Sequence, residues 1–440
     1  MPAQDGPRRP SIDRRRFLAL CGAAALAGCS AADDGTPSTT TTSTTTTTTE
    51  TTRTERTTTA RPSFSGTWPG YGYDLANTGY NTESPALSGD AGRWSTFVEG
   101  YRTLPAPAVS ESGVYIGSAH KLFGFVRANG DTAWDVDMGR TADRFTHKFT
   151  PTVRDGVVYG VARDLAGADS GSDRPGTLVA VDEMSGAIRW RKEPYVSGSP
   201  TVVDDLVVYP TSTVTSGAIE ARHTTDGSLA WRDPFGDPSG SFGAPAYADG
   251  VLYATATIGD RDPRTGRVVA LDPATGDRRW TRDVDGGANS APVVAGDAVI
   301  FADDRGTVHS IDRSDRTERW RVSVGDSVYA TPAVTPDRVF AISGGTLSAI
   351  DRGAGAVTWT APIGASHFSS VSVVADTVIV GGPTLYAYDR ATGDPQLTRA
   401  IPGYAGAYGG PVVVDGAMFI GACVKQEAGD LYDNFVYKLS

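Results

Sequence analysis

One short pattern recurs along the chain and constrains its fold more than any other feature. Tryptophan marks most copies, usually with glycine four residues before it and aspartate eight residues before it. Exceptions are Leu397 in the tryptophan position and Val126 and His223 in the aspartate position. "LDPATGDRRW" (271–280) and "IDRGAGAVTW" (350–359) are complete copies, and successive tryptophans lie 39 to 56 residues apart. Periods of this length with short apolar runs predict stacked β units rather than one catalytic domain. The residues assigned to this structural repeat are Asp182, Gly186, Trp190, Asp272, Gly276, Trp280, Trp320, Asp351, Gly355 and Trp359.

Each residue type in the pattern suits a structural role. An aspartate at the start of a hairpin can bond its own backbone, and glycine supplies a positive φ. A tryptophan buries on the order of 200 Å² and is well placed to pack between neighbouring units. Arg316 replaces the glycine in one unit, where we expect strain of about 1 kcal/mol. The pattern is therefore expected to turn hairpins and join sheets, without a catalytic role.

A second element, such as "TPTVRDGVVYG" (150–160), precedes each copy of the pattern. Together the two elements predict four short antiparallel strands per unit. Seven complete units lie between Pro107 and Leu397, and the tail from Pro411 would form an eighth with residues 86–100. We therefore predict an all-β fold, an eight-bladed β-propeller whose ring is closed by N- and C-terminal strands, because closure removes free sheet edges. Seven blades is the alternative, and residues 68–81 are expected to be a lead-in segment.

The combined pattern resembles the pyrroloquinoline-quinone-like (PQQ-like) β-propeller repeat over roughly residues 68–440. In architecture it is similar to BamB-type lipoproteins of the bacterial outer-membrane assembly machine. The same resemblance implies an alternative, a quinone-dependent oxidoreductase with an adjacent cysteine pair and a calcium ion. Cys423 has no neighbouring cysteine, and the acidic stretch 163–176 does not match a calcium loop. We expect no cofactor and no metal, with PQQ and Ca²⁺ only under the alternative.

The N-terminus has the features of an export signal. Arg14, Arg15, Phe17 and Leu18 precede an apolar run to residue 27, which resembles a twin-arginine signal. This run is too short to span a bilayer of about 30 Å. It ends at "LAGC" (26–29), which resembles a lipobox and predicts lipid attachment at Cys29. We expect a signal peptide at 1–28, a Thr-rich disordered linker at 29–63 and the propeller at 64–440.

The charge of the chain limits its partners. The formal net charge is −11, and without residues 1–28 it would be near −14. Aspartate and arginine far outnumber glutamate and lysine, which resembles secreted proteins of salt-loving archaea. High salt would screen the repulsion within such a surface. An acidic propeller argues against a nucleic-acid partner. A salt-loving archaeon would also lack the outer membrane that the bacterial assembly role requires.

Residues just before each innermost strand are expected to surround one mouth of the central channel. Rings of side chains at a channel mouth are frequent ligand sites, so we predict binding of a peptide, glycan or small anion there. The alternative is ordinary packing of loop aromatics. The candidates are Tyr101, Arg102, His147, Lys148, Asn289, Tyr329, His367, Phe368 and Tyr408.

These features predict an exported, lipid-anchored propeller at the outer surface of the cell membrane. We expect a non-catalytic binding or assembly scaffold with an unknown protein or glycan partner, as a monomer or within a membrane complex. No residue is assigned a catalytic role, and the quinone-dependent oxidoreductase stays as the alternative, because propellers host both activities.

Overall fold

A computed structural model of the chain describes fifteen stretches, all within one unit, residues 61–440. The expected signal peptide, Cys29 and the linker to residue 63 lie outside the described residues. Within the described part no helix is long and apolar enough to cross a membrane. The described stretches are 66–87, 92–99, 104–118, 120–138, 149–163, 175–213, 215–236, 239–240, 243–259, 263–364, 370–382, 384–400, 404–406, 409–425 and 432–439.

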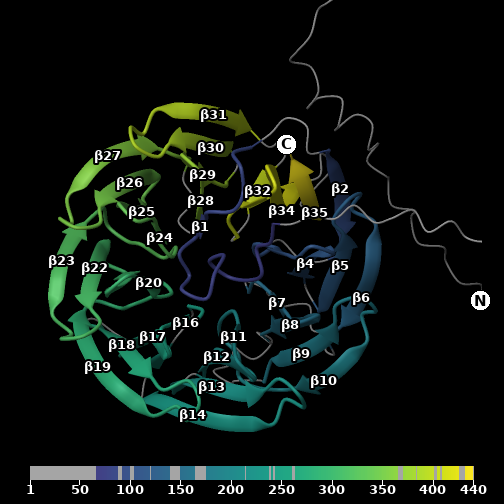
Figure 1. The fold of residues 1–440 in the computed structure, drawn as a ribbon, viewed down its shortest axis with the longest axis horizontal. Coiled ribbons are helices and arrows are strands. Elements are labelled where there is room, and N and C mark those ends of the chain that lie inside the picture. The colour runs from purple at the N-terminus through teal and green to yellow at the C-terminus, as the bar shows by residue number, and fades with distance from the viewer. Residues whose placement is uncertain are drawn as a thin grey trace, which may run out of the picture. The chain divides into compact units, whose positions relative to one another are not determined.

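The strands form eight antiparallel sheets arranged as the blades of a ring (Figure 1). This confirms the eight-bladed all-β propeller, and the seven-bladed alternative is wrong. Blades 1 to 4 comprise β3 (Ala108–Val109), β4 (Gly113–Ser118), β5 (Lys121–Val126), β6 (Thr132–Asp137); β7 (Thr152–Arg154), β8 (Val157–Ala162), β9 (Thr177–Asp182), β10 (Ile188–Lys192); β11 (Thr201–Val203), β12 (Leu206–Ser212), β13 (Gly217–His223), β14 (Leu229–Gly236); and β16 (Ala246–Ala248), β17 (Val251–Ile258), β18 (Thr265–Leu271), β19 (Arg278–Asp285), with β15 (Ser239–Gly240) beside β17.

The other half of the ring has the same plan, with two short additional strands. Blades 5 to 8 comprise β20 (Val293–Ala295), β21 (Ala298–Ala302), β22 (Thr307–Asp312), β23 (Glu318–Ser323); β24 (Ala333–Val334), β25 (Arg338–Ser343), β26 (Thr346–Asp351), β27 (Val357–Pro362); β28 (Val371–Val374), β29 (Thr377–Val380), β30 (Thr384–Asp389), β31 (Pro395–Ala400), with β1 (Tyr80–Asn81) parallel to β28; and β33 (Val412–Val414), β34 (Ala417–Lys425), β35 (Tyr432–Leu439), β2 (Trp94–Val98), with β32 (Tyr404–Gly406) beside β34.

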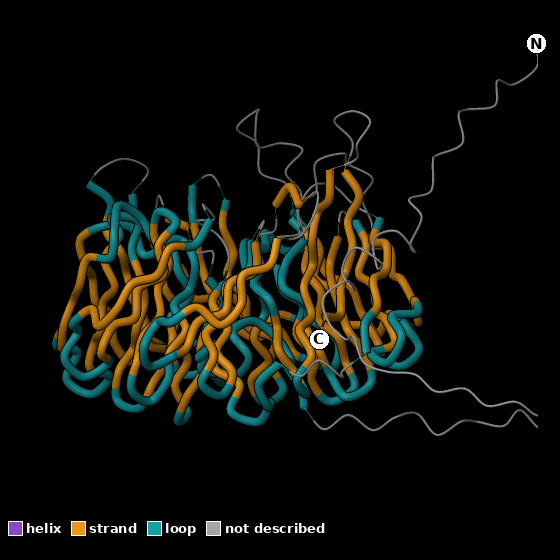
Figure 2. The backbone as a smooth tube through the Cα atoms, turned by 90° about the horizontal axis from the view of Figure 1, so that it is seen from above, coloured by secondary structure: helices purple, strands orange, loops and turns teal. Residues whose placement is uncertain are grey.

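The strand order gives the ring two different faces. Because the four strands of a blade alternate in direction, the first and third connections of each blade lie on one face, which we call the turn face. The second connection and the link to the next blade lie on the opposite face, which we call the mouth face. Figure 2 shows the strands running between these faces, with short loops along one of them.

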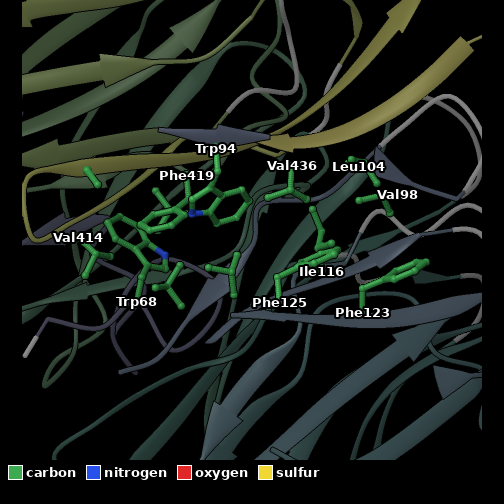
Figure 3. Close-up of a cluster of buried hydrophobic side chains, with 14 residues drawn as sticks. Trp68, Trp94, Val98, Leu104, Ile116, Phe123, Phe125, Val414, Phe419 and Val436 are labelled. Atoms are coloured by element: carbon green, nitrogen blue, oxygen red, sulfur yellow. The ribbon is translucent and has the colours of Figure 1, made fainter. Parts of the chain in front are cut away.

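The ring closes in blade 8, which combines strands from both ends of the unit. β2 pairs antiparallel with β35, so that Trp94 lies opposite Lys438 and Val98 opposite Asn434. Side chains of blades 8 and 1 form a shared apolar core at this seam, shown in Figure 3. The predicted closure by N- and C-terminal strands is therefore confirmed.

The repeated tryptophan and glycine meet across every blade boundary at which both are present. Trp134 of blade 1 lies against Gly186 of blade 2, where a Cβ atom would come within 2.6 Å of the tryptophan. The indole nitrogen of Trp134 also donates to the carbonyl oxygen of Glu183, at 2.9 Å. The same two contacts recur for Trp94 with Gly130, Trp190 with Gly227, Trp231 with Gly276, Trp320 with Gly355 and Trp359 with Gly393.

The boundary between blades 4 and 5 departs from this rule. Arg316 occupies the glycine position of blade 5 and has a φ of 67°. The facing Trp280 is half-buried, and among the described residues no hydrogen bond from its indole is seen. The boundary that has a side chain at the glycine position is therefore also the one at which the tryptophan packs less closely against the next blade.

The repeated aspartate holds the turn that carries the glycine. Asp182 accepts from the backbone nitrogen of Ser185 at 3.0 Å, and Gly186 donates to the carbonyl oxygen of Asp182 at 2.9 Å. Arg189 forms an ion pair with Asp182 at 2.8 Å and, with these bonds, lowers the pKa of Asp182 well below its usual value. Asp272 makes the same turn, and the Arg279 guanidinium lowers its pKa.

Candidate functional site

The structure describes two of the nine side chains expected at the channel mouth. Asn289 and Tyr329 lie in the loops before β20 and β24, on the mouth face of neighbouring blades. Tyr329 is 41% exposed, whereas Asn289 is half-buried and accepts from the Thr257 hydroxyl at 2.8 Å. The other seven lie outside the described residues: Tyr101, Arg102, His147, Lys148, His367, Phe368 and Tyr408.

A polar cluster adjoins Asn289 on the mouth face between blades 4 and 5. Asp304 accepts from the backbone nitrogen of Gly287 at 2.8 Å and forms an ion pair with Arg264 at 2.7 Å. Both charged residues stand between the second and third strands of their blades. Sequence reasoning considered only the residues before innermost strands, and therefore missed this part of the mouth.

A buried histidine supports the loop that carries Asp304. The two ring nitrogens of His309 lie 3.1 Å from a carboxylate oxygen of Asp303 and 2.9 Å from one of Glu318. The ring stacks on Phe301, with centroids 5.0 Å apart. Asp303 also accepts from the backbone nitrogen of Thr307 at 2.7 Å. These contacts use both polar ends of the histidine, so we assign it to positioning the mouth loop.

The channel is lined by residues 66–84, which we call the channel segment. It follows the inner wall of the ring (purple in Figure 1) and visits the blades in order. At each bonded blade, one amide of the innermost strand donates to a carbonyl oxygen of the segment, which satisfies backbone groups that would otherwise face the channel. These bonds run from Val109 to Trp68, Val153 to Pro69, Tyr247 to Leu75, Val294 to Ala76, Val334 to Thr78 and Val373 to Gly79, at 2.6 to 2.9 Å.

Both ends of the channel segment are attached at the seam between blades 8 and 1. Arg127 of blade 1 donates to the Gly66 carbonyl oxygen at 2.6 Å, and Asp415 of blade 8 accepts from the Gly66 nitrogen at 3.1 Å. At the other end, the Gly416 nitrogen donates to the Ser84 hydroxyl at 3.3 Å. The segment therefore starts and ends beside one turn of blade 8, on the turn face.

Buried polar side chains hold the middle of the channel segment. Asn77 donates to the carbonyl oxygens of Ala244 and Pro292, at 3.0 and 3.1 Å, and so connects blades 4 and 5. Tyr71 donates to the Thr331 hydroxyl at 2.7 Å, and burial raises the pKa of Tyr71. The lead-in segment expected from the sequence is thus integrated in the ring by side-chain and backbone bonds.

The described residues do not fit a quinone with calcium. Calcium takes six to eight oxygen ligands, several of them carboxylates. Among the described side chains, no group of three or more His, Cys, Asp or Glu is placed to hold a metal. In the channel segment, Asp74 has both carboxylate oxygens bonded to Thr78, at 2.9 and 2.7 Å. Cys423, the cysteine within the described part, is a buried thiol in β34.

The fold and its repeat define the class of protein, a PQQ-like β-propeller of eight blades. A family model described as "Outer membrane protein assembly factor BamB" matches residues 119–260, 173–286 and 343–437. These matches cover more than half of the chain, and the protein therefore belongs to this family.

Individual relatives agree with the fold. An outer membrane protein assembly factor BamB from Xanthomonas campestris pv. campestris is 32% identical over 115 residues, which are 23% of this chain and 27% of that protein. The chain thus matches about a quarter of that relative's length. BamB from Moraxella catarrhalis has a TM-score of 0.58 at 18% identity, covering 80% of this chain and 98% of the other.

Enzymes share the same architecture. The quinohemoprotein alcohol dehydrogenase ADHIIG from Pseudomonas putida HK5 has a TM-score of 0.67 at 15% identity, covering 85% of this chain and 80% of the other. At such identities the likeness to a solved structure shows the fold alone, since propellers host unrelated functions.

Proposed function

We propose that this protein is an exported, lipid-anchored propeller that acts as a non-catalytic binding or assembly scaffold outside the cytoplasm. The observation that carries the proposal is the match to the assembly-factor family over more than half of the chain. The partner is a protein or glycan bound at the mouth face, and the propeller works as a monomer or within a membrane complex.

The arrangement of the channel supports a binding role for the mouth face. The channel segment occupies the inner wall of the ring, and its carbonyl oxygens already accept from the innermost strands of six blades. On the mouth face, Tyr329 and the Arg264 side chain are partly exposed, whereas Asn289 is half-buried and the Asp304 carboxylate that pairs with Arg264 is buried. A partly exposed aromatic beside charged and amide groups suits recognition of a polar partner.

The test is capture of partners from native membranes at high salt, with the tagged full chain as bait. The double variant Tyr329→Ala with Asn289→Ala should lose partners that the unchanged chain retains, as should His147→Ala with His367→Ala. Met184→Ala is the matched control, because Met184 is 64% exposed but lies in a turn of blade 2 on the opposite face. Equal recovery with all variants would reject the mouth face as the binding surface.

The anchor is tested separately. In the expected organisation, residues 1–28 are a signal peptide, 29–63 a linker and 64–440 the propeller, with Cys29 carrying the lipid. Cys29→Ser should move the protein from the membrane fraction to the soluble fraction and remove the lipid mass from its N-terminus. Cys21→Ser is the control, because that cysteine would leave with the signal. Unchanged membrane association of the first variant would contradict lipidation at this position.

The quinone-dependent alternative has a direct test. The protein would be incubated with PQQ and Ca²⁺, and its absorbance spectrum and alcohol-dependent dye reduction measured. Neither bound quinone nor reduction is expected, because the described residues offer no carboxylate cluster for the calcium ion. Stoichiometric quinone binding with dye reduction would replace the scaffold proposal by an oxidoreductase.

A further inference from the structure

The channel segment leaves two blades, 3 and 8, without this backbone bond among the described residues. It accepts from an amide of the innermost strand in blades 1, 2, 4, 5, 6 and 7, but among the described residues it makes no such bond to Val202 in blade 3. In blade 8 the Asn81 side chain instead donates to the Val413 carbonyl oxygen at 2.9 Å. β11 pairs with β12 in the same register in which β7 pairs with β8. The Val202 N–H group therefore faces the channel just as Val153 N–H does, at a position where its neighbours are bonded to the segment.

A cavity of about 260 Å³ lies at this gap, between the channel segment and blades 2 and 3. Residues 70–74 leave the wall here, and the Gly72 carbonyl oxygen accepts from Gly79 N–H at 2.7 Å, which holds this turn in place. Gly72 has a φ of 67°, and a Cβ atom there would lie 2.6 Å from Asn77 Cα. The loop, and with it the gap, is thus fixed by a residue that must be glycine.

The wall of the cavity combines apolar surface with hydrogen-bond donors. Leu75 and Pro200 supply apolar surface, and Arg154 brings a guanidinium group beside Val202, donating to its carbonyl oxygen at 3.0 Å. Arginine carries five N–H donors in all. The Arg154 side chain, at the turn-face end of β7, is 37% exposed.

Tyr73 adds a strained backbone to the same wall. Its φ is 77°, a conformation that bulky side chains rarely adopt. Its ring lies against Trp68, with centroids 5.1 Å apart. Strained residues persist where the surrounding structure holds them, and they concentrate at ligand sites. The strain therefore marks this wall independently of the missing bond.

We propose that this cavity binds a small monocarboxylate with a short apolar chain. One carboxylate oxygen accepts from Val202 N–H and the other from the Arg154 guanidinium, while the apolar chain lies against Leu75 and Pro200. The carboxylate takes the place of the carbonyl oxygen that the segment supplies to six other blades. The single Arg154 guanidinium compensates one negative charge, and Asp74, which also lines the cavity, opposes any further charge on the ligand. The carboxylate can belong to a free acid or to the C-terminus of an extended peptide.

Ligand-observed NMR titrations of the full chain test this site in one fixed high-salt buffer. The probes are 3-methylbutanoate as the free acid and N-acetyl-Gly-Ala-Val as the peptide terminus. The uncharged 3-methylbutan-1-ol and the dianion 3-methylglutarate should bind more weakly than 3-methylbutanoate. Binding of the acid alone assigns the site to small molecules, and stronger binding of the peptide assigns it to chain termini. Equal binding of the alcohol and the acid, or binding of neither probe, overturns the proposal.

Two variants link the binding to the cavity. Arg154→Met should lower the affinity for 3-methylbutanoate about tenfold, because a charge-assisted hydrogen bond is removed. Arg279→Met is the control, since Arg279 pairs with Asp272 on the turn face of blade 4, away from the cavity. Leu75→Trp fills the cavity and should abolish binding, with an unchanged melting temperature showing that the ring is intact. Unchanged affinity in Arg154→Met would overturn the proposal even if Leu75→Trp failed to fold.

Discussion

Arg127 of blade 1 and Asp415 of blade 8 form an ion pair across the seam at which the ring closes, with 2.7 Å between Nη2 and Oδ2. Arg127 is 1% exposed, and its guanidinium lies over the Phe419 ring at 5.8 Å. Burial lowers the pKa of Arg127, and the carboxylate of Asp415 opposes this effect. Both residues also bond the backbone of Gly66, so one pair joins the two terminal blades and the start of the channel segment.

Removing the arginine should open this seam. Arg127→Met keeps the apolar stem but leaves Asp415 and the Gly66 carbonyl oxygen without their partner. Loss of one member of a buried pair costs about 3 kcal/mol, and we expect that decrease in the free energy of unfolding by chemical denaturation at constant salt. Arg267→Met, which breaks the more exposed pair with Asp283, should cost much less. Equal losses in both variants would show that the Arg127–Asp415 pair at the seam contributes no more stability than a more exposed ion pair.

The tryptophan–glycine contact between blades predicts that two glycine substitutions in blade 6 reduce stability by different amounts. Gly355 has a φ of 68° and a Cβ atom there would lie 2.6 Å from Trp320, whereas Gly344 has a φ of 54° and open space around it. Gly344→Ala measures backbone strain alone, about 1 kcal/mol. Gly355→Ala adds overpacking and should cost about 1–3 kcal/mol more in the free energy of unfolding. Equal costs would show that the contact with Trp320 contributes nothing.

Blade 5 permits the reverse experiment, because it lacks the glycine. Arg316→Gly should relieve the strain of a φ of 67° and let Trp280 approach the turn. Part of this gain is offset by the greater freedom of glycine in the unfolded chain, so we expect a net increase of about 1 kcal/mol in the free energy of unfolding. Tryptophan fluorescence would report deeper burial of Trp280. A less stable variant would refute the assignment of strain to this position.

The fold was predictable because its information is local and repeated. Alternating apolar residues, turn residues and the Asp–Gly–Trp spacing recur in most blades, and each copy specifies one hairpin and one contact with the next blade. The division of blade 8 followed from the same count, since Trp94 and the tail from Pro411 each supply part of a unit.

The path of the channel segment was not predictable in the same way. Its bonds to the blades use backbone groups, which every residue carries, so its side chains show no period. The role of Arg127 was hidden for a related reason, because its partner lies 288 residues away along the chain. At the mouth, Asn289 was a candidate because of its position before a strand, whereas Arg264 and Asp304 meet only when blades 4 and 5 are adjacent.

An unsatisfied amide in blade 8 predicts a stabilising substitution. Asn434 is buried in β35, and within the described part of the chain neither polar atom of its side chain has a hydrogen-bond partner. Leucine has the same branching without the polar atoms, so Asn434→Leu should raise the free energy of unfolding by about 1–2 kcal/mol. Asn81 is the control, because its buried amide donates to the Val413 carbonyl oxygen at 2.9 Å. Asn81→Leu should be destabilising, and a loss of stability in both variants would contradict this account.

The repeated turn aspartates predict how stability depends on pH. Hydrogen bonds and neighbouring arginines lower the pKa values of Asp182, Asp272 and Asp312 below the ordinary value of 3.8. The unfolded chain therefore binds more protons than the folded ring in acid, and the stability that these groups contribute is present above the unfolded pKa. It should be lost as pH falls from about 5 to about 2. Asp272→Asn keeps an oxygen for the turn but cannot titrate, so its free energy of unfolding should fall less steeply over this range. Denaturant titrations at constant high salt measure both slopes, and identical slopes would show that Asp272 carries no such linkage.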